Sequence, residues 1–61
     1  MKARMTIFAP TAAEARQELL AIARSVGEKA KVEEIRPQGS DWLVTYTATP
    51  GTIRKMEEQV S

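Results

Sequence analysis

Apolar and polar residues alternate along residues 2–9, which is the period of a β-strand with one buried face. The odd-numbered residues from Ala3 to Ile7 are apolar, and the residues between them are polar. Phe8 falls on the same side as the polar residues, although it is aromatic. Pro10 ends the pattern because it has no amide donor. The sequence therefore predicts an N-terminal strand that buries its odd-numbered side chains.

The next segment repeats its apolar residues every three or four positions between a helix start and a helix stop. Thr11 followed by Glu14 forms a capping box, in which both side chains satisfy free amide groups of the first turn. The apolar stripe runs to Val26, and Gly27 suits the left-handed conformation that often ends a helix. This pattern predicts a helix between Thr11 and Gly27.

Two further strand patterns follow. Residues 29–36 alternate less regularly, with Val32 on one side and Ile35 on the other. Residues 37–40 have the composition of a turn, and residues 41–48 are rich in β-branched and aromatic side chains. We therefore predict a β-hairpin whose second strand is the more apolar.

Residues 49–60 predict a second helix. Thr49 can cap it, and Pro50 suits its first helical position. Its charges oppose the helix dipole, because Arg54 and Lys55 precede its two glutamates. We therefore expect this helix to depend on packing.

The element order β-α-β-β-α predicts a single α+β domain, residues 1–61. One solution places the third strand centrally and antiparallel to both others, in the order 1-3-2, with both helices on one face. This is a ferredoxin-like arrangement that lacks its last strand. The alternative places the first strand beside the second in parallel. In the 1-3-2 order the first strand is an open edge, which can pair with another chain unless charges such as Lys2 and Arg4 blunt it.

The predicted sheet also has a face turned away from the helices. If Met5, Val32 and Val44 face the helices, Trp42 and Tyr46 belong to the core, and the opposite face carries an apolar group among threonines. We therefore predict a protein-interaction surface on the sheet edge and outer face, formed by Arg4, Thr6, Phe8, Ile35, Leu43 and Thr45.

Composition limits the possible chemistry. The 61 residues include no cysteine and no histidine, which excludes disulfides, the usual zinc sites and His-based catalysis. Glu33 and Glu34 are adjacent, and neighbours on a regular strand point to opposite faces, so we expect no paired-carboxylate site. The sequence thus predicts a protein that is not an enzyme and binds neither a cofactor nor a metal.

The net charge of +1 gives little general attraction to polyanions. No apolar run approaches the roughly 20 residues that span a bilayer, and we expect a cytoplasmic protein without membrane contact. Our first hypothesis is a small non-catalytic interaction module that binds itself, as a homodimer, or another protein. The alternative is nucleic-acid or anion binding through a modest basic set, namely Lys2, Lys31, Arg36, Arg54 and Lys55.

The element order from the first helix to the last, together with the Tyr-Thr-Ala-Thr stretch at residues 46–49, is similar to that of the small αββα head–tail joining protein of lambda-like phages. The N-terminal strand departs from that pattern. The similarity is one of topology, and it assigns no functional residue.

Overall fold

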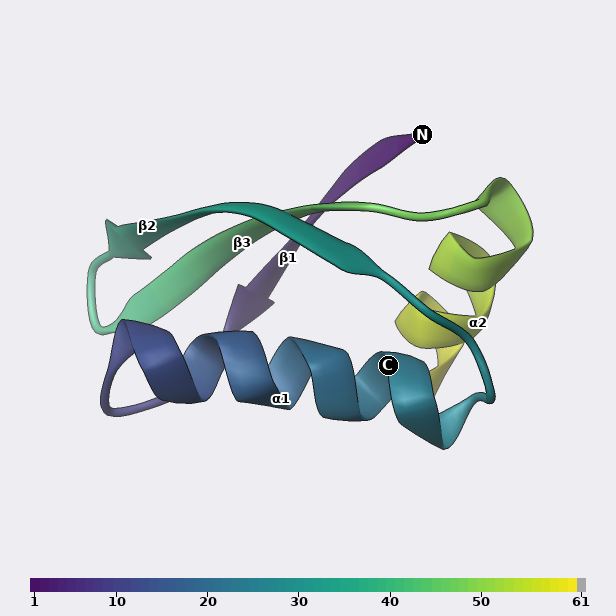
Figure 1. The fold of residues 1–61 in the computed structure, drawn as a ribbon. Coiled ribbons are helices and arrows are strands. Elements are labelled where there is room, and N and C mark those ends of the chain that lie inside the picture. Colours follow the sequence, from purple (N-terminus) through teal and green to yellow (C-terminus); the bar gives the residue numbers. More distant parts are fainter. Residues whose placement is uncertain (61) are drawn as a thin grey trace.

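The computed structural model describes residues 1–60, which form three strands and two helices (Figure 1). In chain order these are β1 (Lys2–Ile7), α1 (Ala12–Ser25), β2 (Lys31–Gln38), β3 (Asp41–Thr47) and α2 (Pro50–Val60). The sheet has the order β1-β3-β2, and β3 runs antiparallel to both neighbours. Figure 1 shows both helices on the same side of the sheet. The predicted 1-3-2 order is confirmed, and the parallel alternative is wrong.

The core lies between the sheet and the helices. Leu19, Val44 and Tyr46 are fully buried, and small alanines such as Ala15 and Ala23 let α1 lie close to the strands. Met56 is the fully buried apolar residue of α2. Because only a few large side chains fill this core, each one carries a large share of the stability.

The structure shows the Thr11 half of the predicted capping box and the predicted glycine stop of α1. The Thr11 hydroxyl accepts a hydrogen bond from the Glu14 amide at 3.2 Å. After the last turn, Gly27 adopts a φ of 73°, and its amide donates to the carbonyl of Arg24. Glycine adopts this left-handed conformation without the steric cost that other residues incur.

A β-bulge in β2 corrects the predicted outer face. The register shifts between Val32 and Glu34, so Glu33 is the extra residue. As a result Ile35 lies opposite Val44, on the helix side, where it packs against the core. The prediction that Ile35 belongs to the outer face is therefore wrong, because one inserted residue reverses the side-chain alternation of the strand.

The same bulge turns two neighbouring carboxylates to the outer face. Glu33 accepts a hydrogen bond from the Thr47 hydroxyl at 3.1 Å, and Glu34 forms an ion pair with Arg36. Thr47 and Arg36 both lie on the side of the sheet away from the helices, as the strand registers show. The expectation that these glutamates point to opposite faces is wrong.

Pro37 belongs to β2, although its residue type predicted a turn. A two-residue turn at Gly39 and Ser40 joins the strands, and Gln38 pairs with Asp41. In such a hairpin the closing pair exchanges hydrogen bonds, so the Pro37 nitrogen points away from β3. Proline is tolerated there because β2 is an edge strand and this nitrogen has no ladder partner.

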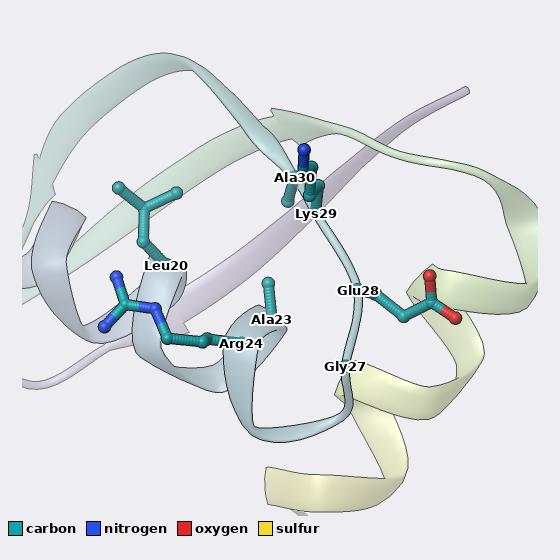
Figure 2. Close-up of a pocket in the computed structure, with 7 residues that line it drawn as sticks. All are labelled: Leu20, Ala23, Arg24, Gly27, Glu28, Lys29 and Ala30. Carbon is teal, nitrogen blue, oxygen red and sulfur yellow. The ribbon is translucent and has the colours of Figure 1, made fainter.

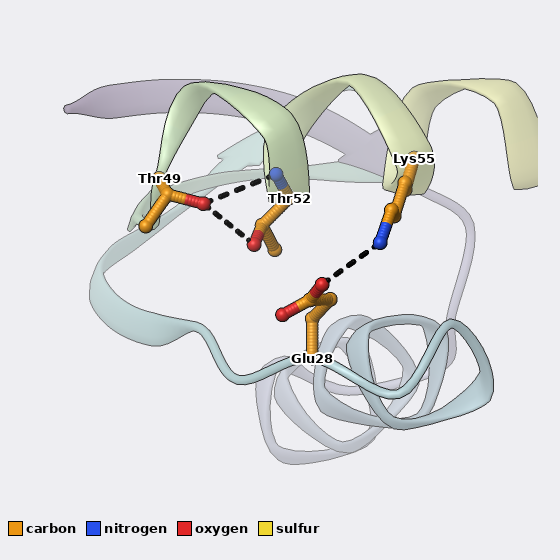
Figure 3. A network of polar contacts seen from close by, with 4 residues as sticks. All are labelled: Glu28, Thr49, Thr52 and Lys55. Carbon is orange, nitrogen blue, oxygen red and sulfur yellow. Dashed lines mark hydrogen bonds and ion pairs between the residues drawn. The ribbon is translucent and has the colours of Figure 1, made fainter.

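Local contacts hold α2 in place (Figure 3). The Thr49 hydroxyl accepts a hydrogen bond from the Thr52 amide at 3.2 Å and shares another with the Thr52 hydroxyl at 2.8 Å. Lys55 forms an ion pair with Glu28 at 3.0 Å, which links α2 to the segment after α1. The predicted Thr49 cap is confirmed.

Thr49→Ala is expected to lower the free energy of unfolding by about 1–2 kcal/mol, because it removes a helix cap. It also leaves the buried Thr52 hydroxyl without this partner. Thr49→Ser retains the hydroxyl and serves as the control. Urea denaturation of the two variants measures the difference. Equal stability of the two variants would show that the cap contributes nothing.

The Tyr46 hydroxyl is buried and has no hydrogen-bond partner within residues 1–60. Burying an unpaired hydroxyl costs about 1–3 kcal/mol. We therefore expect Tyr46→Phe to raise the free energy of unfolding by about 1 kcal/mol at neutral pH, because the ring packing is preserved. Thermal denaturation tests this. A loss of stability would mean that the hydroxyl makes a favourable contact in solution.

The same hydroxyl makes stability depend on alkaline pH. Burial, and secondarily the negative charge of Glu57, raise the pKa of Tyr46 above its ordinary value of 10.0. The folded state thus holds the phenol proton more tightly than the unfolded state does. This stabilisation is complete below pH 10 and is lost as the pH rises through the folded-state pKa. Urea denaturation above pH 10 should therefore show a steeper loss for the wild type than for Tyr46→Phe.

Candidate interaction surface on β1 and the outer sheet face

β1 is an open edge, because it pairs with β3 on one side and no strand of residues 1–60 lies on the other. The Ala48 amide donates to the Met1 carbonyl at 3.0 Å, which fixes the phase of hydrogen bonding along this ladder. Since alternate residues of an antiparallel strand face the partner, Ala3, Met5 and Ile7 bond to β3. The amide and carbonyl groups of Lys2, Arg4 and Thr6 therefore point outward from the edge.

The other edge of the sheet is less suited to pairing. β2 carries the bulge at Glu33 and the proline at Pro37, which has no donor. Bulges and prolines are two common means by which edge strands avoid adding a further strand. β1 has a continuous register from Lys2 to Ile7. The regular open edge of this sheet is thus β1.

The outer face beside β1 presents rows of side chains across three strands. Arg4, Thr45 and Glu34 form one row, and the next row contains Leu43 between Thr6 and Arg36. The Thr6 hydroxyl donates to the Gln38 side-chain oxygen at 3.3 Å and so connects the two edge strands. All three residues of the first row, with Leu43 and Arg36 of the second, line a depression on this face.

The structure brings together four of the six residues predicted for the interaction surface. Arg4, Thr6, Leu43 and Thr45 share the outer face, and Ile35 lies on the helix side. Phe8 follows the last residue of β1 and is 78% exposed.

Phe8 is exposed although the backbone around it is held in place. Its neighbours Ile7 and Ala9 are buried, and the Trp42 indole donates to the Ala9 carbonyl at 2.9 Å. The chain is therefore anchored on both sides of the exposed ring. An aromatic side chain presented from an anchored backbone can contact a partner without a large loss of conformational entropy.

A second hollow lies beside the C-terminal end of α1 (Figure 2), and sequence reasoning did not identify it. Leu20 and Ala23 of α1 and Ala30 supply its apolar lining, and Arg24 and Lys29 add charge. The Glu28 side chain points toward α2. This hollow can receive an apolar side chain.

The basic residues predicted for nucleic-acid contact do not form one surface. Lys2 and Lys31 lie on either side of Thr47 in one cross-strand row of the outer face. Arg36 lies further along the same face in its ion pair with Glu34. Arg54 and Lys55 are on α2, in the helix layer, and Lys55 is paired with Glu28. The set is thus divided between the two layers of the molecule.

Neither helix within residues 1–60 combines the length and apolar content needed to cross a bilayer. Within the same residues, no group of three acidic side chains converges as metal ligands would. No protein-family model, curated protein or solved structure matches this chain. The similarity to the phage joining protein therefore stays one of element order.

Proposed function

We propose that this protein is a non-catalytic interaction module that binds an extended segment of polypeptide as an additional strand on β1. The outward backbone groups of Lys2, Arg4 and Thr6 are the observation that carries the proposal. Main-chain hydrogen bonds give affinity in this mode of recognition, and side-chain contacts give specificity. The core is small, and pairing of the free edge would also stabilise the fold.

The side chains beside the edge indicate which segments fit. Arg4 favours an acidic or polar residue opposite it, and Lys2 favours an acidic residue or an aromatic ring. Phe8 favours an apolar residue or the stem of a long side chain. The outer face next to this edge is mostly threonine, with Leu43 as its apolar contact. A bound strand would therefore alternate polar and apolar residues.

Selection from a library of random peptides of about ten residues, a typical strand length, tests the proposal. Amide NMR shifts then map each binder on the isotope-labelled protein. We expect binders to perturb the amides of Lys2, Arg4 and Thr6 and to slow their hydrogen exchange. A library that yields no binder, or only binders at the hollow beside α1, would overturn the proposal.

Nucleic-acid binding is the second candidate, and the row of Lys2 and Lys31 is the observation in its favour. Binding to phosphates through these lysines would weaken steeply as salt is added, because counterions are released. Titration of fluorescent single-stranded DNA and RNA at low salt tests this. Charge reversal at Lys2 and Lys31 should abolish any such binding, whereas reversal at Arg54 should not.

A further inference from the structure

We propose that the strand added to β1 is β1 of a second copy, antiparallel, with Met5 of one copy opposite Met5 of the other. This inference rests on the proposed function and specifies its partner. A two-fold axis through the Met5 pair would make one six-stranded sheet. The axis is perpendicular to the sheet, so the helices of both copies would lie on the same face.

Backbone geometry allows few registers for such a pair. Outward groups belong to the even-numbered residues of β1, so an even-numbered residue must lie opposite an even-numbered residue. A pair centred on Arg4 places two guanidinium groups opposite each other. A shift that places Lys2 opposite Arg4 also brings like charges together. Like charges directly opposite destabilise an antiparallel pair.

The register centred on Met5 avoids both conflicts and pairs residues 2–8 of one copy with residues 2–8 of the other. Arg4 then lies opposite Thr6, and Lys2 lies opposite Phe8. The lysine stem can cover the exposed ring, and its ammonium group can contact the aromatic face. A register centred on Thr6 also avoids like charges, but it opposes only residues 4–8. Both registers place a cationic side chain opposite Phe8, and the Met5 register forms more hydrogen bonds because more residues are paired.

The helix side is compatible with the same register. Ala3 would lie opposite Ile7, and Met5 would lie opposite its own copy, so each facing pair is apolar. Ala3 is partly exposed in the single chain and packs against the edge of the core. Pairing would extend this apolar layer across the new strand junction.

Disulfide trapping tests the register, because the chain has no cysteine and each single-cysteine variant carries one thiol. Arg4→Cys and Thr6→Cys are mixed in equal amounts and oxidised. Opposed residues in a hydrogen-bonded pair have Cα atoms about 5.5 Å apart, which a disulfide can span. We expect the disulfide between residue 4 of one copy and residue 6 of the other to exceed its statistical share. The disulfides between two residues 4 and between two residues 6 should be nearly absent. The same mixture unfolded in urea gives the statistical share and is the control.

Predominance of the disulfide between two residues 4, or between two residues 6, would overturn the proposed register. A folded protein that gives only the statistical mixture, and that sediments as a monomer at every concentration, would overturn self-pairing altogether. In that case peptide binding at the amides of Lys2, Arg4 and Thr6 would still support the proposed function. If neither self-pairing nor peptide binding at these amides is observed, the proposed function is rejected as well.

Salt provides an independent test. Two copies bring four cationic side chains, Lys2 and Arg4 of each, to one junction, so added salt should leave self-association unchanged or strengthen it. Sedimentation at low and high salt measures this. A steep weakening with salt would contradict the register and would indicate an acidic partner segment.

Discussion

Leu19→Ala is expected to lower the free energy of unfolding by about 3 kcal/mol, because truncation of a buried leucine leaves a cavity. Leu19 is fully buried beneath the sheet. At about 0.05–0.15 kcal/mol per residue, a chain of this length has only about 3–9 kcal/mol of stability in total. The substitution therefore removes about one third or more of the total stability.

Leu20→Ala is the matched control, because it deletes the same atoms from the next residue of α1. Leu20 is only partly buried and lines the hollow beside the helix end. Its truncation should cost less than half as much. Urea denaturation followed by circular dichroism compares the two variants. An equal or greater loss for Leu20→Ala would contradict the arrangement of the core.

Arg4→Pro is expected to weaken self-association about tenfold or more, because each copy loses an outward amide donor and leaves a carbonyl of the other copy unpaired. The Arg4 amide points away from β3, so proline removes no hydrogen bond within the chain. The folded single chain should therefore keep nearly its full stability.

Arg4→Thr distinguishes the contribution of the amide donor to self-association from that of the side-chain charge. It retains the donor and removes a cation from the junction, so self-association should be equal to or stronger than that of the wild type. Sedimentation equilibrium of the three proteins measures the dissociation constants. Equal weakening by proline and threonine would indicate that the guanidinium group, and not the edge, makes the contact.

The fold could be predicted from the sequence wherever local signals and periodicity agreed. Thr11 and Gly27 delimit α1, Thr49 caps α2, and the apolar character of β3 indicated its central place. Each of these is a local preference that the tertiary structure reinforces.

The outer face could be predicted only in part, because its composition depends on register. A single extra residue at Glu33 moved Ile35 into contact with the core and brought two carboxylates to the outside. Nothing in the alternation of residues 29–36 specifies where such a bulge lies. The turn predicted at Pro37 was wrong for a similar reason. Whether a proline can lie in a strand depends on whether that strand is at the edge of the sheet and its nitrogen points outward.

The open edge itself followed from element order, but the direction of its backbone groups did not. That direction depends on the hydrogen-bond phase between Met1 and Ala48, which residue types do not encode. The exposure of Phe8 between the buried Ile7 and Ala9, by contrast, agrees with the alternation of residues 2–9.

Amide hydrogen exchange measured over a range of protein concentrations tests the central claim most directly, because exchange reports protection residue by residue. The amides of Arg4 and Thr6 should exchange more slowly as concentration rises. The Ile35 amide points outward from the opposite edge, given the register of β2 with β3, and should not change. Protection of Arg4 and Thr6 without protection of Ile35 is the result we predict. Concentration-independent exchange at both residues, or protection at Ile35 instead, would contradict the assignment of β1 as the pairing edge.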